Sequence, residues 1–113
     1  MFAKENRLRR KKDIDMVFRK GEVAFSGPFF VKYALGRDSV SRFTVIVGTK
    51  SGLKAVGRNL LKRRVRAILQ EAKIGEAKTI FLIVGVKGRF EKVPKFAEIK
   101  NHIDQCLKKL HLA

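Results

Sequence analysis

Residues 79–86 are the segment that most restricts the fold of this chain. They read Thr-Ile-Phe-Leu-Ile-Val-Gly-Val, with a lysine on each side. A strand with one wet face alternates apolar and polar residues, whereas a strand buried on both faces is apolar throughout. We therefore expect residues 79–86 to form a central strand of a sheet. Because 113 residues supply one core and not two, residues 1–113 are predicted to be a single domain.

Three further segments are rich in aromatic and β-branched residues, which favour strands. These are residues 23–25, 29–35 and 43–48. Three other segments repeat apolar residues at the spacing of one helix face. These are residues 11–20, 55–72 and 96–110. The predicted fold is α+β, in the order helix, three strands, helix, strand, helix, with the helices in one layer against a mixed four-stranded sheet.

The net charge indicates a polyanionic partner. Lysine and arginine number 27 against 10 aspartate and glutamate residues, a formal charge of +17 and far more than solubility requires. Apolar residues occur throughout the chain, so the charge belongs to a folded domain and not to a disordered tail. No apolar run reaches the length of a membrane span, and the termini show no amphipathic anchor. We expect a nucleic-acid partner and no membrane.

Cys106 is the only cysteine, so it cannot form an internal disulfide. It lies in the helix predicted at 96–110, where a small buried side chain fits. A lone thiol suits a reducing compartment, and we expect a cytoplasmic protein. His102 stands four residues earlier and could reach the same metal ion, but a tetrahedral site needs three or four protein ligands and no others are apparent. No metal site is predicted.

The helix predicted at 55–72 has a basic face beside its apolar one. At roughly 100° per residue, the apolar side chains occupy one arc, and five polar side chains fall beside it. These five are Arg58, Asn59, Lys62, Arg63 and Arg66. Guanidinium groups donate paired hydrogen bonds to phosphate, and the Asn59 amide can add contacts to sugar or base. The arrangement predicts an RNA-binding face; the competing interpretation is a basic face that is only solvated.

Residues 55–66 also resemble a known family. They read Ala-Val-Gly-Arg-Asn-Leu-Leu-Lys-Arg-Arg-Val-Arg, similar to the motif Ala-Val-x-Arg-Asn-x-x-Lys-Arg-x-x-Arg of the protein subunits of bacterial ribonuclease P. The resemblance extends to that family's opening helix and second strand through Arg7-Leu8-Arg9, Asp13, Val17, Phe18, Gly21 and Phe30-Val31-x-Tyr33. The chain departs from the family pattern at Ile14, Ser51, Leu60 and Ala67.

The resemblance implies a ribonucleoprotein endonuclease that removes the 5′ leader of precursor tRNA. The catalytic RNA subunit would supply the active site and hold Mg²⁺ together with the substrate, and the protein would contribute no catalytic residue. Its partners would be that RNA and precursor tRNA, with no protein oligomer. The implied fold is ribosomal protein S5 domain 2-like, with a left-handed crossover through the second helix, whereas such crossovers are right-handed in about 98% of proteins.

The resemblance also implies two binding sites. The basic helix would face the RNA subunit, and a cleft between the first helix and the sheet would hold the leader on Ile14, Phe18 and Tyr33, with Lys50, Lys54 and Arg66 nearby. Stacking on aromatic rings with neutralised phosphates holds single-stranded RNA without reading its sequence. Lys50 also lies in the turn at residues 48–52, which lacks the ending of a phosphate-binding loop and suits RNA contact. The alternative for Phe18 and Tyr33 is burial in the core.

Two other classes of function stay open at this point. One is a noncatalytic ribosomal or RNA-chaperone protein, and the other is a nuclease that acts without an RNA subunit. Asp13 and Asp15 stand two residues apart on a predicted helix, so their side chains diverge, and no histidine is placed near them. Cleavage assays on precursor tRNA with and without the ribonuclease P RNA separate the three hypotheses.

Overall fold

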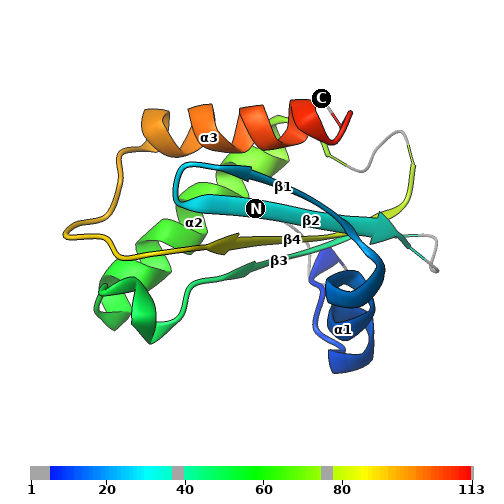
Figure 1. Cartoon of the computed structure of the whole chain (residues 1–113), viewed down its shortest axis with the longest axis horizontal. Coiled ribbons are helices and arrows are strands. Elements are labelled where there is room, and N and C mark those ends of the chain that lie inside the picture. Colours follow the sequence, from blue (N-terminus) through cyan, green and yellow to red (C-terminus); the bar gives the residue numbers. More distant parts are fainter. Residues whose placement is uncertain (1–5, 37–39, 75–77, 113) are drawn as a thin grey trace.

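The computed structural model describes residues 6–36, 40–74 and 78–112. Its elements follow the predicted order, and their ends lie within two residues of the predicted ones. Along the chain they are α1 (Lys11–Lys20), β1 (Glu22–Ser26), β2 (Phe29–Leu35), β3 (Arg42–Ile46), the 3-10 turn η2 (Thr49–Ser51), α2 (Ala55–Glu71), β4 (Ile80–Val86) and α3 (Phe96–Lys109) (Figure 1). The α+β prediction is confirmed.

The four strands form one mixed sheet in the order β1-β2-β4-β3. β4 is central, as its apolar run predicts: it pairs antiparallel with β2 and parallel with β3, and only its last residue, Val86, is not fully buried. β3 and β4 are joined through α2, so the parallel crossover unit that the family resemblance implies is present. The left-handedness of this crossover stays a prediction.

Helices cover both faces of the sheet (Figure 1). α2 and α3 pack on one face, in a core cluster that includes Leu61, Leu82 and Ile103. α1 packs on the other face, where Val17 meets Phe81 and Ile83 in a second, smaller cluster that also contains Leu8 and Met16. The prediction of a single helical layer was therefore wrong. Successive apolar side chains of β4 point to opposite faces, so both faces need cover.

The structure shows where the single cysteine lies. Cys106 is fully buried, and its Sγ lies 3.7 Å from the carbonyl oxygen of Ala24. Burial raises the pKa of the Cys106 thiol, so it stays protonated and serves as a small core residue. Within the described ranges, no helix is both long and apolar enough to cross a membrane.

Candidate nucleic-acid interface

The exposed side of α2 carries a basic groove. The buried side of α2 consists of Leu61, Val65, Ile68 and Leu69, which anchor the helix against the sheet. The groove has a volume of about 510 Å³ and is lined by Asn59, Lys62, Arg63, Arg66, Ala67 and Gln70. Four of the five side chains predicted for the RNA-binding face thus share one groove, and none of the lining residues is acidic. Ala67, one of the departures from the family pattern, leaves part of the groove without a polar side chain.

A second basic hollow lies between α2 and the segment before α1. The main-chain N–H of Leu8 donates to the carbonyl oxygen of Phe43 in β3, 2.9 Å away, and the Leu8 side chain is buried. Arg7 and Arg9 flank this anchored residue and stay exposed. The hollow has a volume of about 170 Å³ and is lined by Arg7, Leu8, Arg9, Phe43, Thr44, Val45 and Arg66.

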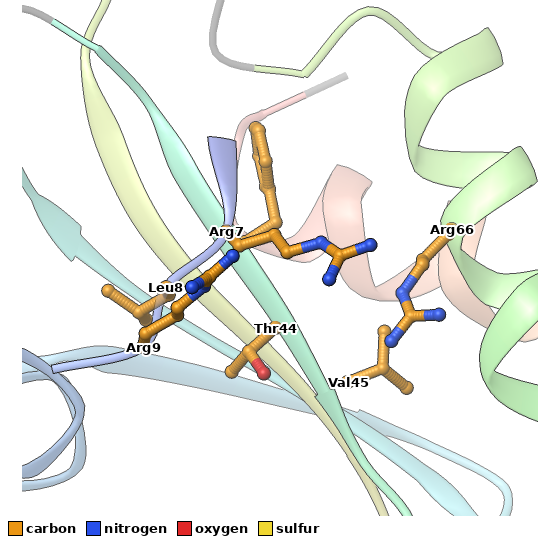
Figure 2. Close-up of a pocket in the computed structure, with 7 residues that line it drawn as sticks. Arg7, Leu8, Arg9, Thr44, Val45 and Arg66 are labelled. Atoms are coloured by element: carbon orange, nitrogen blue, oxygen red, sulfur yellow. The ribbon is translucent and has the colours of Figure 1, made fainter. Parts of the chain in front are cut away.

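Arg66 belongs to both hollows, so they form a continuous basic surface. Figure 2 shows the guanidinium groups of Arg7 and Arg66 extending toward the same space above Val45. Among the residues that the structure describes, no carboxylate lines either hollow to offset the repulsion between these two positively charged groups. A phosphate between the two side chains would accept hydrogen bonds from both and relieve it. The surface therefore has the chemistry of a phosphate-backbone site.

Arg58 is placed differently from the other four predicted residues of α2. Its Nη1 donates to the carbonyl oxygen of Leu53, 2.8 Å away, and it does not line the groove. Arg64 likewise donates to the carbonyl oxygen of Pro94, at 2.6 Å, and so joins α2 to the segment before α3. At least one guanidinium nitrogen of each arginine therefore holds the backbone around α2 in place.

The predicted basic turn before α2 is exposed at Lys50 and Lys54. Ser51 between them is buried, and its carbonyl oxygen accepts from the N–H of Phe90 at 2.7 Å. The departure from the family pattern at Ser51 therefore falls on an interior position. Arg89 lies beside Gly52 and adds a cation that the sequence analysis missed, because a lone arginine in a loop has no periodicity.

The structure separates the three residues predicted for the leader cleft. Ile14 packs against the smaller core cluster, and Phe18 stands nearby with 40% of its surface exposed. The Nζ of Lys32 lies 5.2 Å from the centre of the Phe18 ring and donates to the Phe18 carbonyl oxygen at 2.6 Å. Tyr33 follows Lys32 in β2 and so points to the opposite face. It is 8% exposed and belongs to the larger core cluster, so the prediction that Tyr33 shares a cleft with Ile14 and Phe18 was wrong.

Tyr33 is instead a core residue of β2, an inner strand of the sheet. A hydrogen bond with Glu22, its partner in β1, raises the pKa of the Tyr33 hydroxyl, and burial acts in the same direction. The Nζ of Lys78 lies 5.9 Å from the centre of its ring.

We expect Tyr33→Ala to lower the free energy of unfolding by about 3 kcal/mol, because it empties a packed site. Urea unfolding measures this loss, and Tyr33→Phe, which keeps the ring, is the matched control. A Tyr33→Ala protein of unchanged stability that selectively loses precursor tRNA would restore Tyr33 to the leader site.

The structure shows the surroundings of the residues that were set aside in the sequence analysis. The Nδ1 of His102 lies 2.9 Å from the hydroxyl of Ser26, whereas the Cys106 thiol faces Ala24. Across residues 6–36, 40–74 and 78–112, no three side chains of histidine, cysteine, aspartate or glutamate gather as a metal site would require. Residues 49–51 form a 3-10 turn and not a phosphate-binding loop.

Comparison with known proteins gives one consistent family. Residues 2–111 match the family model described as Ribonuclease P. The chain is 33% identical over 107 residues to the ribonuclease P protein component of Streptococcus pneumoniae serotype 4, covering 93% of this chain and 84% of that protein. It is 32% identical over 113 residues to that of Petrotoga mobilis, covering 96% and 94%.

Solved structures of the same family share the fold. The RNase P protein of Staphylococcus aureus superposes with a TM-score of 0.81 at 23% identity, covering 95% of this chain and 96% of that one. The protein from Thermotoga maritima superposes with a TM-score of 0.73 at 27% identity, covering 91% and 96%. The chain therefore belongs to the ribonuclease P protein family, the protein component of the ribonucleoprotein that processes the 5′ end of tRNA.

Proposed function

We propose that this chain binds the catalytic RNA subunit and the leader of precursor tRNA, and that the RNA subunit carries out the cleavage. The observation that supports this most strongly is the meeting of two basic hollows at Arg66, with no carboxylate among the described residues that line them. A folded RNA presents phosphates at many angles, and a continuous cationic surface of two elements can contact several of them. Release of the counterions held by those phosphates would supply much of the binding free energy.

In this proposal the RNA subunit lies along α2 and the segment before α1. Asn59, Lys62 and Arg63 would contact it in the groove, and Arg7 and Arg66 would hold a phosphate between them. Lys50, Lys54 and Arg58 stand at the start of α2 and would extend the contact; Arg58 has further N–H groups beyond the one that donates to Leu53.

Magnesium ions fit this surface poorly as protein-bound ions. Mg²⁺ takes oxygen ligands, usually carboxylates and phosphates. Among the described residues that line the α2 groove, the side-chain oxygens are the amide oxygens of Asn59 and Gln70, and they stand among three cationic side chains. The Mg²⁺ that the family resemblance implies would accordingly be held by the RNA subunit and the substrate, and no step of the reaction is assigned to a metal bound by this chain. Precursor tRNA as the substrate implies work in the cytoplasm.

The leader is proposed to lie against the exposed ring of Phe18, beside Ile14. Phe18 combines an accessible aromatic face with an adjacent cation, Lys32, whose Nζ lies 5.2 Å from the ring centre. A base can stack on the ring while the ammonium group neutralises a neighbouring phosphate. Neither contact depends on base identity, as a subunit that serves many precursors requires.

Phe18→Ala is expected to weaken binding of precursor tRNA to the reconstituted holoenzyme several-fold and to leave mature tRNA unaffected. Stacking contributes about 1–3 kcal/mol per base, and only the precursor carries the leader. The measurement compares dissociation constants of the two tRNAs. Phe96→Ala is the matched control, because Phe96 is also a helical phenylalanine, 38% exposed. Equal losses for both tRNAs, or none for a stably folded Phe18→Ala protein, would remove Phe18 from the leader site.

A further inference from the structure

α1 covers only part of its face of the sheet, and the open part is aromatic. Strand register aligns Phe25, Phe30, Gly85 and Ile46 in one row across all four strands. Gly85 is two residues from Ile83, which packs under α1, so this row lies on the α1 face. Phe25 is nevertheless 48% exposed and Ile46 41% exposed. Figure 1 shows why: α1 lies below one end of the sheet, whereas the turn between β1 and β2 is at the other end.

The two phenylalanines of this row form a defined surface, which we call the β1–β2 platform (Phe25 and Phe30). Their ring centres lie 6.3 Å apart, with an angle of 48° between the ring planes. A side chain at Gly85 would overlap the Phe30 ring, so this ring rests directly on the backbone of β4. Support from the backbone keeps Phe30 in place although α1 does not cover it.

The surroundings of the platform are positively charged. The Nζ of Lys87 lies 4.6 Å from the centre of the Phe25 ring. Lys32 occupies the next row toward α1, opposite Val23 of β1. Glu22 is the only acidic residue in the four strands, and it pairs with Tyr33, which points to the other face. A large exposed apolar patch usually marks a binding surface, and here the occupant must offer flat apolar groups together with negative charge.

We infer that the β1–β2 platform is a second stacking site for the single-stranded leader, separate from Phe18. Bases would stack on Phe25 and Phe30, and the ammonium groups of Lys87 and Lys32 would contact the phosphates between them. Open sheet faces with exposed aromatic rings stack unpaired bases in this way. The inference rests on the proposed leader-binding function and assigns to β1 and β2 the aromatic role that Tyr33 does not fill.

The path between the two stacking sites follows from contacts already described. Phe18 contacts Lys32, Lys32 pairs with Val23, and the adjoining row of the two strands contains Phe30 and Phe25. Val23 is itself 40% exposed. A leader that leaves Phe18 along this face reaches the platform only after further nucleotides, so the two sites are occupied at different leader lengths.

The experiment uses the reconstituted holoenzyme and precursor tRNAs with leaders of increasing length. We expect Phe25→Ala and Phe30→Ala each to reduce affinity about five-fold or more for long leaders only. Their effects should begin at a different leader length from that of Phe18→Ala. Phe25→Trp keeps an aromatic face and should retain affinity, whereas Phe25→Leu keeps apolar area alone and should not. Phe96→Ala is the control, and thermal unfolding verifies that each variant folds.

The outcomes distinguish the inference from the function on which it rests. If Phe18→Ala weakens leader binding but the folded platform variants bind every leader normally, the platform is not a leader site and the proposed function stands. If none of the three variants shows any dependence on the leader, both fail. A platform that packs against a second copy of the chain would lower the oligomer mass in Phe25→Ala without changing leader affinity, and that result would also overturn the inference.

Discussion

The purified chain, incubated with precursor tRNA and Mg²⁺, is expected to release no leader, and addition of the RNA subunit is expected to restore cleavage. A protein nuclease needs an acid and a base, or a metal held by the protein, beside the scissile phosphate. Among the described residues the candidates do not converge: Asp13 and Asp15 diverge on α1, and His102 Nδ1 lies against Ser26. Enzymes accelerate reactions by at least about 10⁶-fold. The mixture with the RNA subunit should therefore contain cleaved leader, and the mixture without it should contain none.

The experiment must exclude cleavage by a contaminating, unrelated ribonuclease. Cleavage by such a contaminant persists in every variant of the chain and gives products other than the mature 5′ end. Cleavage at the correct site that is lost in a folded point variant, and that is indifferent to added RNA subunit, would contradict the prediction. The chain would then be a nuclease in its own right.

The second large effect is expected for Arg7→Ala combined with Arg66→Ala. This pair removes two cations from the hollow between α2 and the segment before α1. Affinity falls as the salt concentration rises, and each lost phosphate contact reduces the steepness of log affinity against log salt by about 1. We expect the double variant to bind the RNA subunit at least about tenfold more weakly at low salt, with a slope smaller by one to two.

Replacing Lys92 and Lys108 with alanine provides the matched control, because both are exposed, both lie outside the two basic hollows, and the net charge changes equally. Titrations over a range of salt concentrations give both slopes. If one phosphate bridges Arg7 and Arg66, each single variant will lose most of what the double variant loses, since the two effects are not additive. Equal slopes for the two double variants would indicate a general charge effect and no specific site.

The basic face of α2 could be predicted from the sequence because helical periodicity is local. Residues 55–66 determine which side chains flank the apolar arc, and Asn59, Lys62, Arg63 and Arg66 share a groove as expected. The same reasoning could not place Arg7 beside Arg66. Their proximity depends on the hydrogen bond between Leu8 and Phe43, which joins segments more than thirty residues apart.

The residues of the predicted leader site could not be assigned to one face of the sheet from the sequence either. β2 reads Phe-Phe-Val-Lys-Tyr-Ala-Leu, with aromatic residues at both odd and even positions, so its sequence does not tell which face α1 will cover. Neighbouring residues of a strand point to opposite faces, so a shift of one residue would exchange the two sets of side chains. In the structure, Tyr33 points into the larger core and Phe30 points to the α1 face.

By itself the sequence determined the order of the elements, the central position of residues 79–86, the family and the polyanionic partner. Each of these depends on composition or on a pattern within one segment. Only the tertiary structure decided that α1 packs opposite α2 and α3, that Arg7 and Arg66 line one hollow, and that Phe25 stays exposed beside a half-buried Phe30. These features depend on long-range packing and strand register, because contacts between distant segments determine which of two possible faces each side chain occupies.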